Sequence, residues 1–545
     1  MTDTLNPTGL ADDGLDMTGT TPGLFSFRSL PVRARHHLMV VVLIAIGQAI
    51  ALAGVALGLT RLLSHPERWE PLTLTLVVLA VIVSVWLRFR ERLDGERLGQ
   101  EVAHATRLAM ATHLLKLPTR GSRPVPRDVL LRFIGDLTAL KTWYARGSVS
   151  ILVGAPLLIT AVTVIALQSW HLGTLLGLVI LVGILIQILL LSRLRDAGNL
   201  ARKQRGRLAR FIVDRTEALS SVQAYSTSDR EITRIDKRSS ALTTTMVDRT
   251  RWAGALRAIA EAAASSIPLL VLLDWKLTGS VALHSAATTV IIGGLLTPRI
   301  RELGRVLEYH ALATISRDRI AAFLALNTLD ERSDARALRK RGGDIRLRGL
   351  ELAGVFNPLG FKAAAGARIA LTGRNGSGKS RLLGLIAGLE EPTAGYISID
   401  HQSTAKRSMR SLRRIVALAS LDAPLMRGSV NANIRHRRAD DLETQLATYG
   451  YRQLIDELNQ GGDTRIGPRG EGVSLGQKKR IILLRALARQ PAILLLDEIE
   501  TNLDAAGLEV LDSVFANFPG TIIAATHSRH WIDKCNGRWT LDEPA

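Results

Sequence analysis

The sequence predicts a multi-domain protein in which an all-α six-helix transmembrane domain is followed by an α/β domain. Two observations predict this order. Long uncharged segments rich in Leu, Val and Ile occur only in the first 300 residues. After residue 344, short apolar runs alternate with helical patterns, which is typical of a largely parallel sheet. The length of 545 residues leaves room for two or more domains.

Composition narrows the class of protein. The chain has 70 Lys and Arg against 49 Asp and Glu, a net charge of +21, yet 47% of its residues are hydrophobic and its mean hydropathy is +0.16. A basic charge alone suggests a nucleic-acid partner, but positive mean hydropathy favours apolar spans joined to a charged remainder. Disordered, collagen-like and disulfide-built proteins are excluded. The single cysteine, Cys535, cannot form a disulfide within the chain, which favours a reducing compartment for the folded domains.

Six apolar segments are predicted to span a membrane, since a helix rising about 1.5 Å per residue crosses about 30 Å of hydrocarbon with some 20 residues. The fifth segment contains Arg257 and Glu261. At a spacing of four residues they could line a transport pathway, but an ordinary cytosolic ion pair is favoured. The segments are Leu38–Thr60, Pro71–Leu87, two spans within the uncharged Gly147–Ser192 that turn at residues 168–173, Trp252–Leu273 and Leu277–Pro298.

The distribution of Lys and Arg predicts how the spans are oriented. Residues 1–37, 88–146 and 193–251 together contain 29 Lys and Arg, whereas the connections expected on the other side contain 3. Positively charged loops remain on the cytoplasmic side, so the N-terminus and both long loops are expected there. The charge excess is then explained by orientation and by contact with anionic membrane lipids, and no nucleic-acid partner is expected.

These observations divide the chain into four parts. Both inner loops are 59 residues long and show helical periodicity, so each is expected to form a helical hairpin that extends from the spans into the cytosol. The expected parts are a cytosolic N-terminal tail (1–35), the six-span domain with its two long cytosolic loops (36–326), a linker (327–343) and the α/β domain (344–545).

The strongest motif in the chain is a G-x-x-x-x-G-K-S phosphate loop between an apolar strand and an apolar helix. Glycines let the backbone curl until its N–H groups point at phosphate oxygens, Lys379 reaches the β- and γ-phosphates, and the Ser380 hydroxyl can bind Mg²⁺. The residues predicted to hold the nucleotide here are Gly373, Arg374, Asn375, Gly376, Ser377, Gly378, Lys379, Ser380 and Arg381. The predicted strands of the domain are Arg368–Thr372, Ile415–Ala419, Ala492–Leu496 and Thr521–Thr526.

Two further strand ends carry candidate catalytic residues. Four apolar residues predict a buried strand whose end presents Asp497, placed to act near the metal, and Glu498, free to act on a water. His527 ends the next apolar strand, where an imidazole could contact the γ-phosphate or hold the attacking water. Either feature alone is also compatible with an ordinary surface residue. Together with the phosphate loop, they predict a Mg²⁺-nucleotide site.

The order of these motifs carries a family resemblance. The phosphate loop, Val473–Gln477, Asp497–Glu498, Thr501–Asp504 and His527 follow one another as in the nucleotide-binding domain of the ABC transporter superfamily. Six spans fused ahead of that domain resemble an exporter-type half-transporter, over roughly residues 30 to 540. The resemblance implies an α/β P-loop NTPase (ABC) domain, ATP and Mg²⁺ as cofactors, and an ATPase coupled to transport.

The resemblance also implies roles for individual residues. Glu498 and His527 would be catalytic, and Ser380 and Asp497 would hold the metal. ATP would lie between two cassettes, so that the signature of one chain closes the site of the other. The nucleotide contacts implied outside the phosphate loop are Ser474, Gly476, Gln477 and Asp504.

The sequence departs from the family pattern at several positions. Leu475 stands where the signature has glycine, and its branched side chain would obstruct close approach of backbone to phosphate. The usual glutamine falls at Leu421, and Pro468 stands where a glutamate would contact the membrane domain. The aromatic residue that stacks on adenine is missing near Gly354, and its substitutes, Phe356 or Phe361, are more consistent with core residues.

An intact phosphate loop beside a degenerate signature favours a heterodimer with a second half-transporter subunit over a homodimer. The location implied is the plasma (bacterial inner) membrane, with the N-terminus and nucleotide-binding domain cytoplasmic. Alternatives left open are an exporter-shaped ABC importer, a membrane-bound regulatory protein with a partly degenerate cassette and, less consistent with six spans, a soluble ABC-type ATPase acting on nucleic acid. The transported substrate is not identified by the sequence.

Overall fold

The computed structural model shows two compact units, the first of which ends at Leu326. Lys116 belongs with the second unit, and its carbonyl accepts a hydrogen bond from the N–H of Leu329 at 2.9 Å. The residues that the structure describes are 30–64, 71–118, 129–278, 283–326, 328–329, 336–421, 424–435, 442–467, 470–501 and 503–541.

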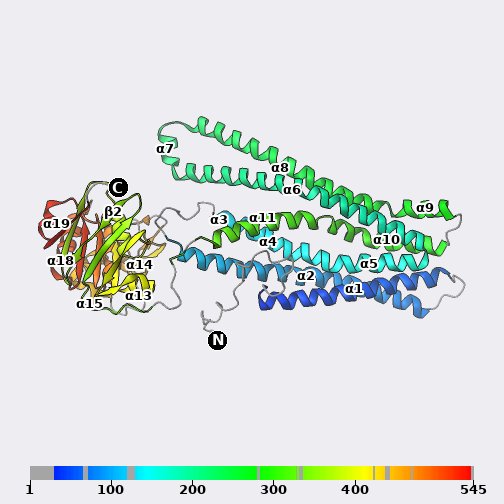
Figure 1. Cartoon of the computed structure of the whole chain (residues 1–545), viewed down its shortest axis with the longest axis horizontal. Coiled ribbons are helices and arrows are strands. Elements are labelled where there is room, and N and C mark those ends of the chain that lie inside the picture. Colours follow the sequence, from blue (N-terminus) through cyan, green and yellow to red (C-terminus); the bar gives the residue numbers. More distant parts are fainter. Residues whose placement is uncertain are drawn as a thin grey trace. The chain divides into compact units, whose positions relative to one another are not determined.

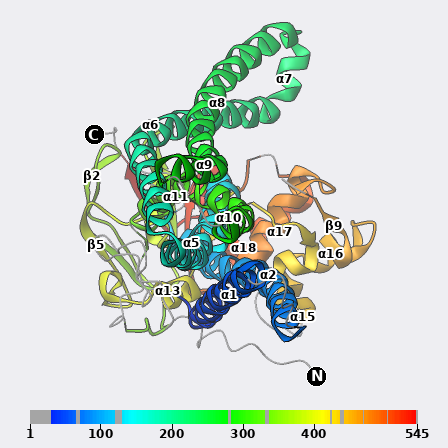
Figure 2. The ribbon, with the colours of Figure 1, turned by 90° about the vertical axis from the view of Figure 1, so that its right-hand side faces the viewer.

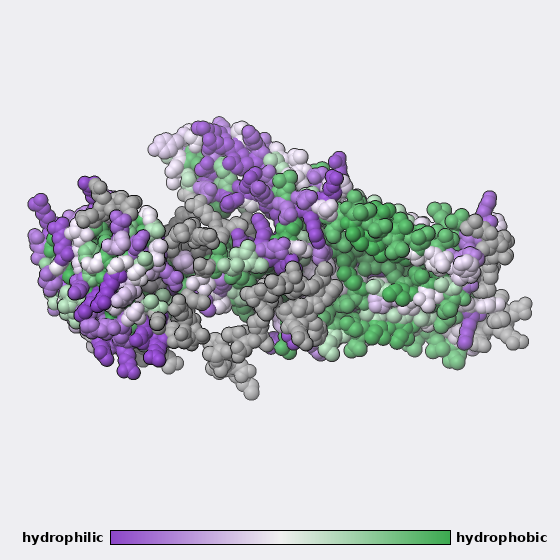
Figure 3. Space-filling model, in the orientation of Figure 1, coloured by the Kyte–Doolittle hydropathy of each residue, from purple (hydrophilic) through white to green (hydrophobic). Residues whose placement is uncertain are grey.

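The described part of the first unit is helical throughout (Figure 1). Large apolar side chains stay exposed on its long helices, among them Leu72 at 70% and Leu189 at 68%, and Figure 3 shows such residues covering much of the visible face. The long helices are α1 (Val32–Ser64), α2 (Pro71–Lys116), α5 (Val149–Gln168), α6 (Trp170–Glu217), α8 (Ser228–Ser265), α9 (Ile267–Thr278), α10 (Leu283–Leu303) and α11 (Val306–Leu324). Shorter helical segments are α3 (Val129–Leu131), the π-helices Arg132–Asp136 and Trp143–Ser148, α4 (Leu137–Thr142) and α7 (Leu219–Ala224).

The number of membrane spans is supported only in part. Four helical runs among the described residues are long and apolar enough to cross a membrane, namely α1, α2, residues 132–168 and α6. Helices α8 and α9 meet at a bend of 43° and would make a fifth span if they act together. The predicted sixth span does not meet this criterion. Its helix, α10, buries Ser285, Thr288 and Thr289 and packs against α5, α8 and α1.

Two details of the membrane unit differ from expectation. Arg257 and Glu261 do not pair with each other: Arg257 Nη2 lies 2.6 Å from an oxygen of Glu308, and Glu261 pairs with Arg301. Neighbouring helices bring opposite charges closer than the i,i+4 spacing does, so these pairs tie α8 to α10 and α11. Helix α1 already begins at Val32, within the expected tail, whose residues 1–29 lie outside the described residues.

The second inner loop is a helical hairpin, which confirms the expectation. Helices α6 and α8 pack along each other and are joined through α7 (Figure 1). Seen along the bundle, α1, α2, α5 and α10 gather together, and α7 lies at the far end of the hairpin (Figure 2). Glu231 closes the turn by accepting from Arg215 at 2.5 Å and from Arg234 at 2.6 Å.

The second unit is built on a five-stranded parallel sheet, and all four predicted strands are present in it. The strand order is β12-β4-β11-β10-β7. Both faces of a parallel sheet are covered, so its strands are continuous apolar runs. Leu494 and Leu496 accordingly pack in one buried cluster, and Ile493 and Leu495 in another. The strands are β4 (Arg368–Gly373), β7 (Val416–Ala419), β10 (Ile493–Asp497), β11 (Thr521–Ala525) and β12 (Gly537–Leu541).

The remaining strands form an antiparallel sheet and a two-stranded ribbon. The sheet contains β1 (Ile345–Leu352), β2 (Phe356–Leu359), β3 (Lys362–Ala363), β5 (Ala394–Ile399) and β6 (Gln402–Ser403), and the ribbon β8 (Gly428–Ser429) and β9 (Arg465–Ile466). The helices of this unit are α12 (Lys379–Ile386), α13 (Met409–Ile415), α14 (Val430–Ile434), α15 (Leu442–Leu446), α16 (Tyr451–Asp456), α17 (Leu475–Leu487), α18 (Ala505–Asn517) and α19 (Arg529–Asp533).

The thiol of Cys535 is expected to be unreactive in the folded protein. Its Sγ lies 3.3 Å from the carbonyl oxygen of Trp531, and burial raises the pKa of Cys535 to about 11. Because the thiolate is the nucleophile, alkylation by iodoacetamide at pH 8 should be about 100-fold slower than in the urea-unfolded chain. Mass spectrometry of timed samples measures both rates. Equal rates in the two states would contradict the effect of partial burial on the thiol.

Candidate functional site

The candidate site lies where three neighbouring parallel strands end. Strand β4 runs into the phosphate loop, β10 ends at Asp497, and β11 is followed by Thr526 and His527. Because β11 lies between β4 and β10, their carboxyl ends meet at one edge of the sheet. This edge is where ligands bind in open α/β sheets. The sheet therefore brings together the phosphate loop, the Asp497–Glu498 pair and His527, as the sequence predicts.

The phosphate loop has a backbone that only glycine adopts readily. Gly376 has φ +85° and Gly378 has φ +93°, and Gly378 precedes the first residue of α12. A Cβ on Gly378 would lie 2.7 Å from a methyl group of Val355 and 3.0 Å from the ring of Phe356. The hydroxyl of Ser377 is buried and has no hydrogen-bond partner among the described residues. An orphaned buried hydroxyl fits a loop built to receive phosphate oxygens.

Lys379 is the cation at the centre of the site. Its side chain is only 4% exposed, and Nζ donates to the carbonyl oxygens of Gly373 at 3.0 Å and Arg374 at 3.2 Å. The same Nζ lies 3.0 Å from Nε2 of His527 and 3.9 Å from a carboxylate oxygen of Glu498. Two candidate catalytic groups thus lie beside the ammonium that the sequence predicts to reach the phosphates.

Asp497 gathers two hydroxyl groups around its carboxylate. Ser380 donates to one oxygen at 2.8 Å and Ser420 to the other at 3.0 Å. Hydroxyl and carboxylate oxygens are the ligands that Mg²⁺ prefers, usually with phosphate and water completing the set. Ser420 was not predicted from the sequence, although it directly follows β7, the strand beside β10. No cluster of three or more His, Cys, Asp and Glu suited to a metal occurs in the described parts of the chain.

Glu498 is held at the strand end by its backbone. It has φ +48°, uncommon for a residue other than glycine, and its N–H donates to the carbonyl oxygen of Ala525 at 3.1 Å. The carboxylate lies 3.7 Å from Nε2 of His527, and both side chains are about half exposed. A carboxylate and an imidazole that share a water-accessible space can orient and deprotonate a water.

The predicted signature begins helix α17 with a capping box. Ser474 Oγ accepts from the N–H of Gln477 at 3.1 Å, and the Gln477 side chain accepts from the N–H of Ser474 at 3.0 Å. The side chain of Leu475, 45% exposed, stands at the first helical position. Gly476 lies against the carboxylate of Asp504, which caps α18.

Two buried cations follow the signature and were not given a role from the sequence. Lys479 is 1% exposed, and its Nζ donates to the carbonyl oxygens of Glu498 at 3.3 Å, of Ile499 at 3.1 Å and of Thr501. Burial lowers the pKa of Lys479. Arg480 donates to Glu457 at 2.9 Å and to Asp504 at 3.3 Å. Helix α17 is thereby attached to the segment that follows β10.

Other predicted residues have different surroundings. Arg381 forms an ion pair with the buried Glu390, with Nε 2.7 Å from the carboxylate. Phe356 is buried in the core, and Phe361 stacks on Trp539 with ring centroids 5.0 Å apart, so both are core residues as the sequence favours. The side chain of Leu421 is 46% exposed. The position at Pro468 lies outside the described residues.

Comparisons with known proteins match both units. The family model described as ABC transporter matches residues 356–501, and the one described as ABC transporter transmembrane region matches residues 38–273. The chain is 24% identical, over 75% of its length and 70% of the relative, to an uncharacterised ABC transporter ATP-binding protein of Bacillus subtilis. It is 25% identical, over 75% of its length and 71% of the relative, to an ATP-dependent lipid A-core flippase of Legionella pneumophila.

A solved structure extends this similarity to the fold. The chain is similar to a bacterial Atm1-family ABC exporter with ATP bound, with a TM-score of 0.83 and 20% identity over 93% of each chain. Both units therefore have the arrangement of helices and sheets found in exporter-type half-transporters.

Proposed function

Because the chain belongs to the ABC transporter family, we propose that it is one subunit of a heterodimeric exporter. It is a multi-pass membrane protein with an exporter-type fold, and its fused ATP-binding domain is an ATPase coupled to transport. Its own phosphate loop would form the competent ATP site with the partner's signature. The observation that carries the proposal is the contrast between two parts of one domain. Lys379, Asp497, Glu498 and His527 converge at one sheet edge, whereas Leu475 occupies the signature position that approaches phosphate.

The residues at the sheet edge fit MgATP. The curled backbone at Gly376 and Gly378, the unpartnered Ser377 hydroxyl and Lys379 present donors to phosphate oxygens. Ser380 and Asp497 present adjacent oxygens that would hold Mg²⁺. When bound, Mg²⁺ would neutralise charge on the phosphates. These fits support the assignment of Arg374, Asn375 and the loop glycines to the nucleotide.

The protein side chains would divide the chemistry of hydrolysis. Glu498 accepts a proton from the attacking water, and His527, 3.7 Å away, orients that water or the γ-phosphate. Lys379, which donates to loop carbonyls, would turn its ammonium to the phosphates when nucleotide arrives. Positioning and charge stabilisation supply most of the acceleration in phosphoryl transfer, so this preorganised edge carries the catalytic power.

The signature side supports the heterodimer. Ser474 and the N-terminus of α17 present N–H groups that suit a phosphate of the opposite nucleotide. Leu475 adds an exposed branched side chain where close approach of backbone is needed. A homodimer would contain this obstruction twice, and a heterodimer once. Gln477 completes the capping box at the start of α17, and Asp504, which caps α18, lies beside Gly476.

Turnover by the isolated chain tests the heterodimer. We expect the purified chain alone to hydrolyse ATP at least about tenfold more slowly than the complex with its co-purified partner subunit, because each self-paired site includes Leu475. Leu475→Gly should raise turnover of the isolated chain about tenfold, and the matched variant Leu475→Ala, which keeps a Cβ, should raise it less. Brisk hydrolysis by the unmodified chain alone, with no gain in Leu475→Gly, would exclude the heterodimer argument.

Location and direction of transport are parts of the same proposal. The proposed location is a bacterial inner membrane. The loops of one side contain 29 Lys and Arg and those of the other side 3, which supports a cytoplasmic position for the N-terminus and the ATP-binding domain. Import by an exporter-shaped member is the competing direction. Transport in inverted membrane vesicles separates the two, since an exporter loads such vesicles in an ATP-dependent manner and an importer empties them.

A regulatory membrane protein is the competing class, and exposed Leu475 is the observation that favours it. The converged Lys379, Glu498 and His527 oppose it, because a cassette without turnover has no use for a water-activating pair. Single-turnover ATP hydrolysis by the chain with its co-purified partner decides between them: the absence of hydrolysis would favour a regulatory protein, and hydrolysis would favour a transporter.

A further inference from the structure

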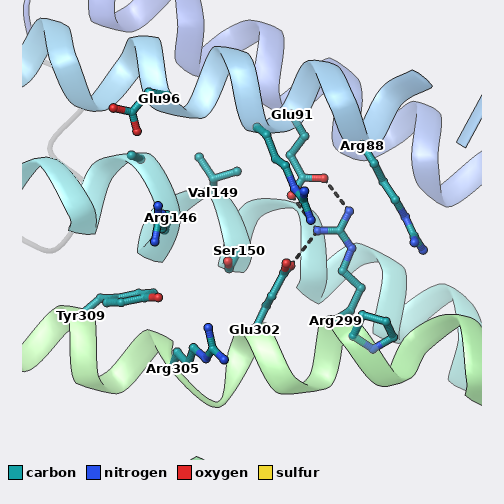
Figure 4. A pocket seen from close by; sticks show the side chains of 13 residues that line it. Arg88, Glu91, Glu96, Arg146, Val149, Ser150, Arg299, Glu302, Arg305 and Tyr309 are labelled. Carbon is teal, nitrogen blue, oxygen red and sulfur yellow. Dashed lines mark hydrogen bonds and ion pairs between the residues drawn. The ribbon is translucent and has the colours of Figure 1, made fainter. Parts of the chain in front are cut away.

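A charged cavity of about 370 Å³ lies within the helical unit, apart from the ATP site. Its wall is formed by α2, the π-helix Trp143–Ser148 with the start of α5, and α10 with the start of α11. The volume is in the range of small-molecule binding sites. Five lining residues are arginines and three are glutamates, so the wall carries a net charge of +2. Figure 4 shows the side chains around this cavity.

The three carboxylates of the wall are already neutralised. Arg299, only 7% exposed, donates to both oxygens of Glu91 at 2.7 and 2.5 Å and to Glu302 at 3.0 Å. Gln48 also accepts from Arg299 at 2.9 Å. Glu96 pairs with Lys141 at 2.8 Å. Every glutamate of the pocket is therefore held by a cation, and the Glu91–Arg299 fork fixes one wall rigidly.

Of the other four arginines, Arg88 donates to the carbonyl oxygen of Leu295 at 3.4 Å, and the remaining three are not neutralised in this way. Arg92, Arg146 and Arg305 are exposed to the cavity or solvent, and none forms an ion pair with a carboxylate in the described parts of the chain. They come from three different elements. Figure 4 shows Arg146 and Arg305 on facing helices, without the dashed lines that join Arg299 to its partners. Tyr309, which also lines the cavity, adds a phenol group beside them.

Orientation of the protein in the membrane does not require this arrangement. The positive-inside rule counts Lys and Arg in the loops and does not depend on where their side chains point. Of the three arginines, Arg146 is close enough to stabilise the charge of Glu96, which is already paired with Lys141. Guanidinium groups that converge on a cavity and form no ion pair of their own repel each other, and an anion in the cavity would remove that repulsion. A guanidinium donates two parallel hydrogen bonds to a phosphate or carboxylate, so converging guanidinium groups suit an anion of either kind.

We propose that this pocket binds the anionic group, a phosphate or carboxylate, of the transported molecule, through Arg92, Arg146 and Arg305, with the Glu91–Arg299 pair positioning the wall. The inference rests on the proposed transport function, since it names the class of substrate that the exporter takes. The pocket would select anionic molecules over neutral and cationic ones. These anions are either amphiphiles with a negatively charged head group or soluble organic anions.

Binding can be measured without nucleotide. The chain with its co-purified partner is placed in phosphatidylcholine nanodiscs and titrated, by tryptophan fluorescence, with dodecyl phosphate, dodecylphosphocholine and dodecyltrimethylammonium. We expect dodecyl phosphate to bind about tenfold more tightly than the other two, because only its head group has a net negative charge: the phosphate of dodecylphosphocholine is offset by its own choline, and dodecyltrimethylammonium is a cation. Glycerol 3-phosphate in a separate arm distinguishes the sources: binding equal to that of dodecyl phosphate indicates a soluble anion, and weaker binding an amphiphile.

Variants test the assigned residues. The triple variant Arg92→Gln, Arg146→Gln, Arg305→Gln should lose the preference for dodecyl phosphate, and the corresponding lysine variant should keep part of it because charge remains. Arg97→Gln is the matched control: Arg97 is on the same helix, pairs with Asp94 and does not line the cavity. It should keep the full preference. A triple glutamine variant that still prefers dodecyl phosphate, or an unmodified complex with no preference, would overturn the proposal.

The outcome is separable from that of the proposed function. A complex that hydrolyses ATP normally but shows no preference among the three amphiphiles refutes the anion pocket and leaves ATP-driven transport standing. A complex that binds dodecyl phosphate preferentially but turns over no ATP refutes the motor and leaves the pocket as an anion-binding site.

Discussion

Replacing Glu498 with glutamine should slow ATP turnover by about 100- to 1000-fold while leaving ATP affinity within about threefold of its original value. Glutamine has the same shape but cannot accept the proton of the attacking water. The donors to the phosphates are the loop N–H groups and Lys379; Glu498→Gln removes a negative charge 3.9 Å from the Lys379 ammonium but leaves these donors in place, so binding is retained. Steady-state ADP release by the complex measures turnover, and a fluorescent ATP analogue measures affinity.

Glu500 provides the matched control for this variant. It is two residues further along, and its carboxylate accepts a hydrogen bond from the hydroxyl of Thr526. Glu500→Gln should therefore reduce turnover far less than Glu498→Gln. Unchanged hydrolysis in Glu498→Gln would remove Glu498 from the role of proton acceptor. A loss of ATP affinity in the same variant would assign the carboxylate to binding.

Gly378→Ala should weaken ATP binding by about 10- to 100-fold. A residue with a side chain is strained at φ +93°, and strain of this kind costs about 1–3 kcal/mol. The new Cβ would also lie 2.7 Å from Val355 and 3.0 Å from the ring of the buried Phe356, so the loop must shift. Equilibrium binding of a fluorescent ATP analogue to the complex measures the loss.

Gly376→Ala separates backbone strain from steric contact. Gly376 has a similar φ of +85°, but a Cβ at this position meets no atom within 4 Å. It should therefore bind ATP more tightly than Gly378→Ala, though less tightly than the unmodified protein. Equal losses in the two variants would show that the contact with Val355 and Phe356 has no part in shaping the loop.

The parts of the fold that the sequence predicts well are those that local pattern determines. A strand covered on both faces must be apolar at every position, so Ile493 to Leu496 predicts a buried strand without knowledge of its neighbours. The spacing of the phosphate loop likewise specifies a strand, a tight turn and a helix. Both predictions depend on residues that are adjacent in the chain.

The parts that the sequence does not predict depend on contacts between distant segments. Ser420 reaches Asp497 because β7 lies beside β10, and strand order is a property of the whole sheet. Arg257 finds Glu308 across the helix bundle instead of Glu261 in its own helix. Hydropathy identifies α1 and α6 as spans directly. It does not give the total number of spans, because α8 and α9 meet at a bend and α10 is too polar to meet the same criterion.

Lys479 has a mechanical consequence. Its ammonium joins the first turns of α17 to the main chain by hydrogen bonds to the carbonyl oxygens of Glu498, Ile499 and Thr501, so we expect the helix and this segment to move as one rigid unit. In the proposed heterodimer, the start of α17 would contact the nucleotide held by the partner. The segment joined to it contains Glu498, the proton acceptor for the nucleotide held by this chain. Departure of phosphate from the partner's nucleotide would then displace Glu498, so that the state of the site closed by Leu475 would alter the geometry of the competent site.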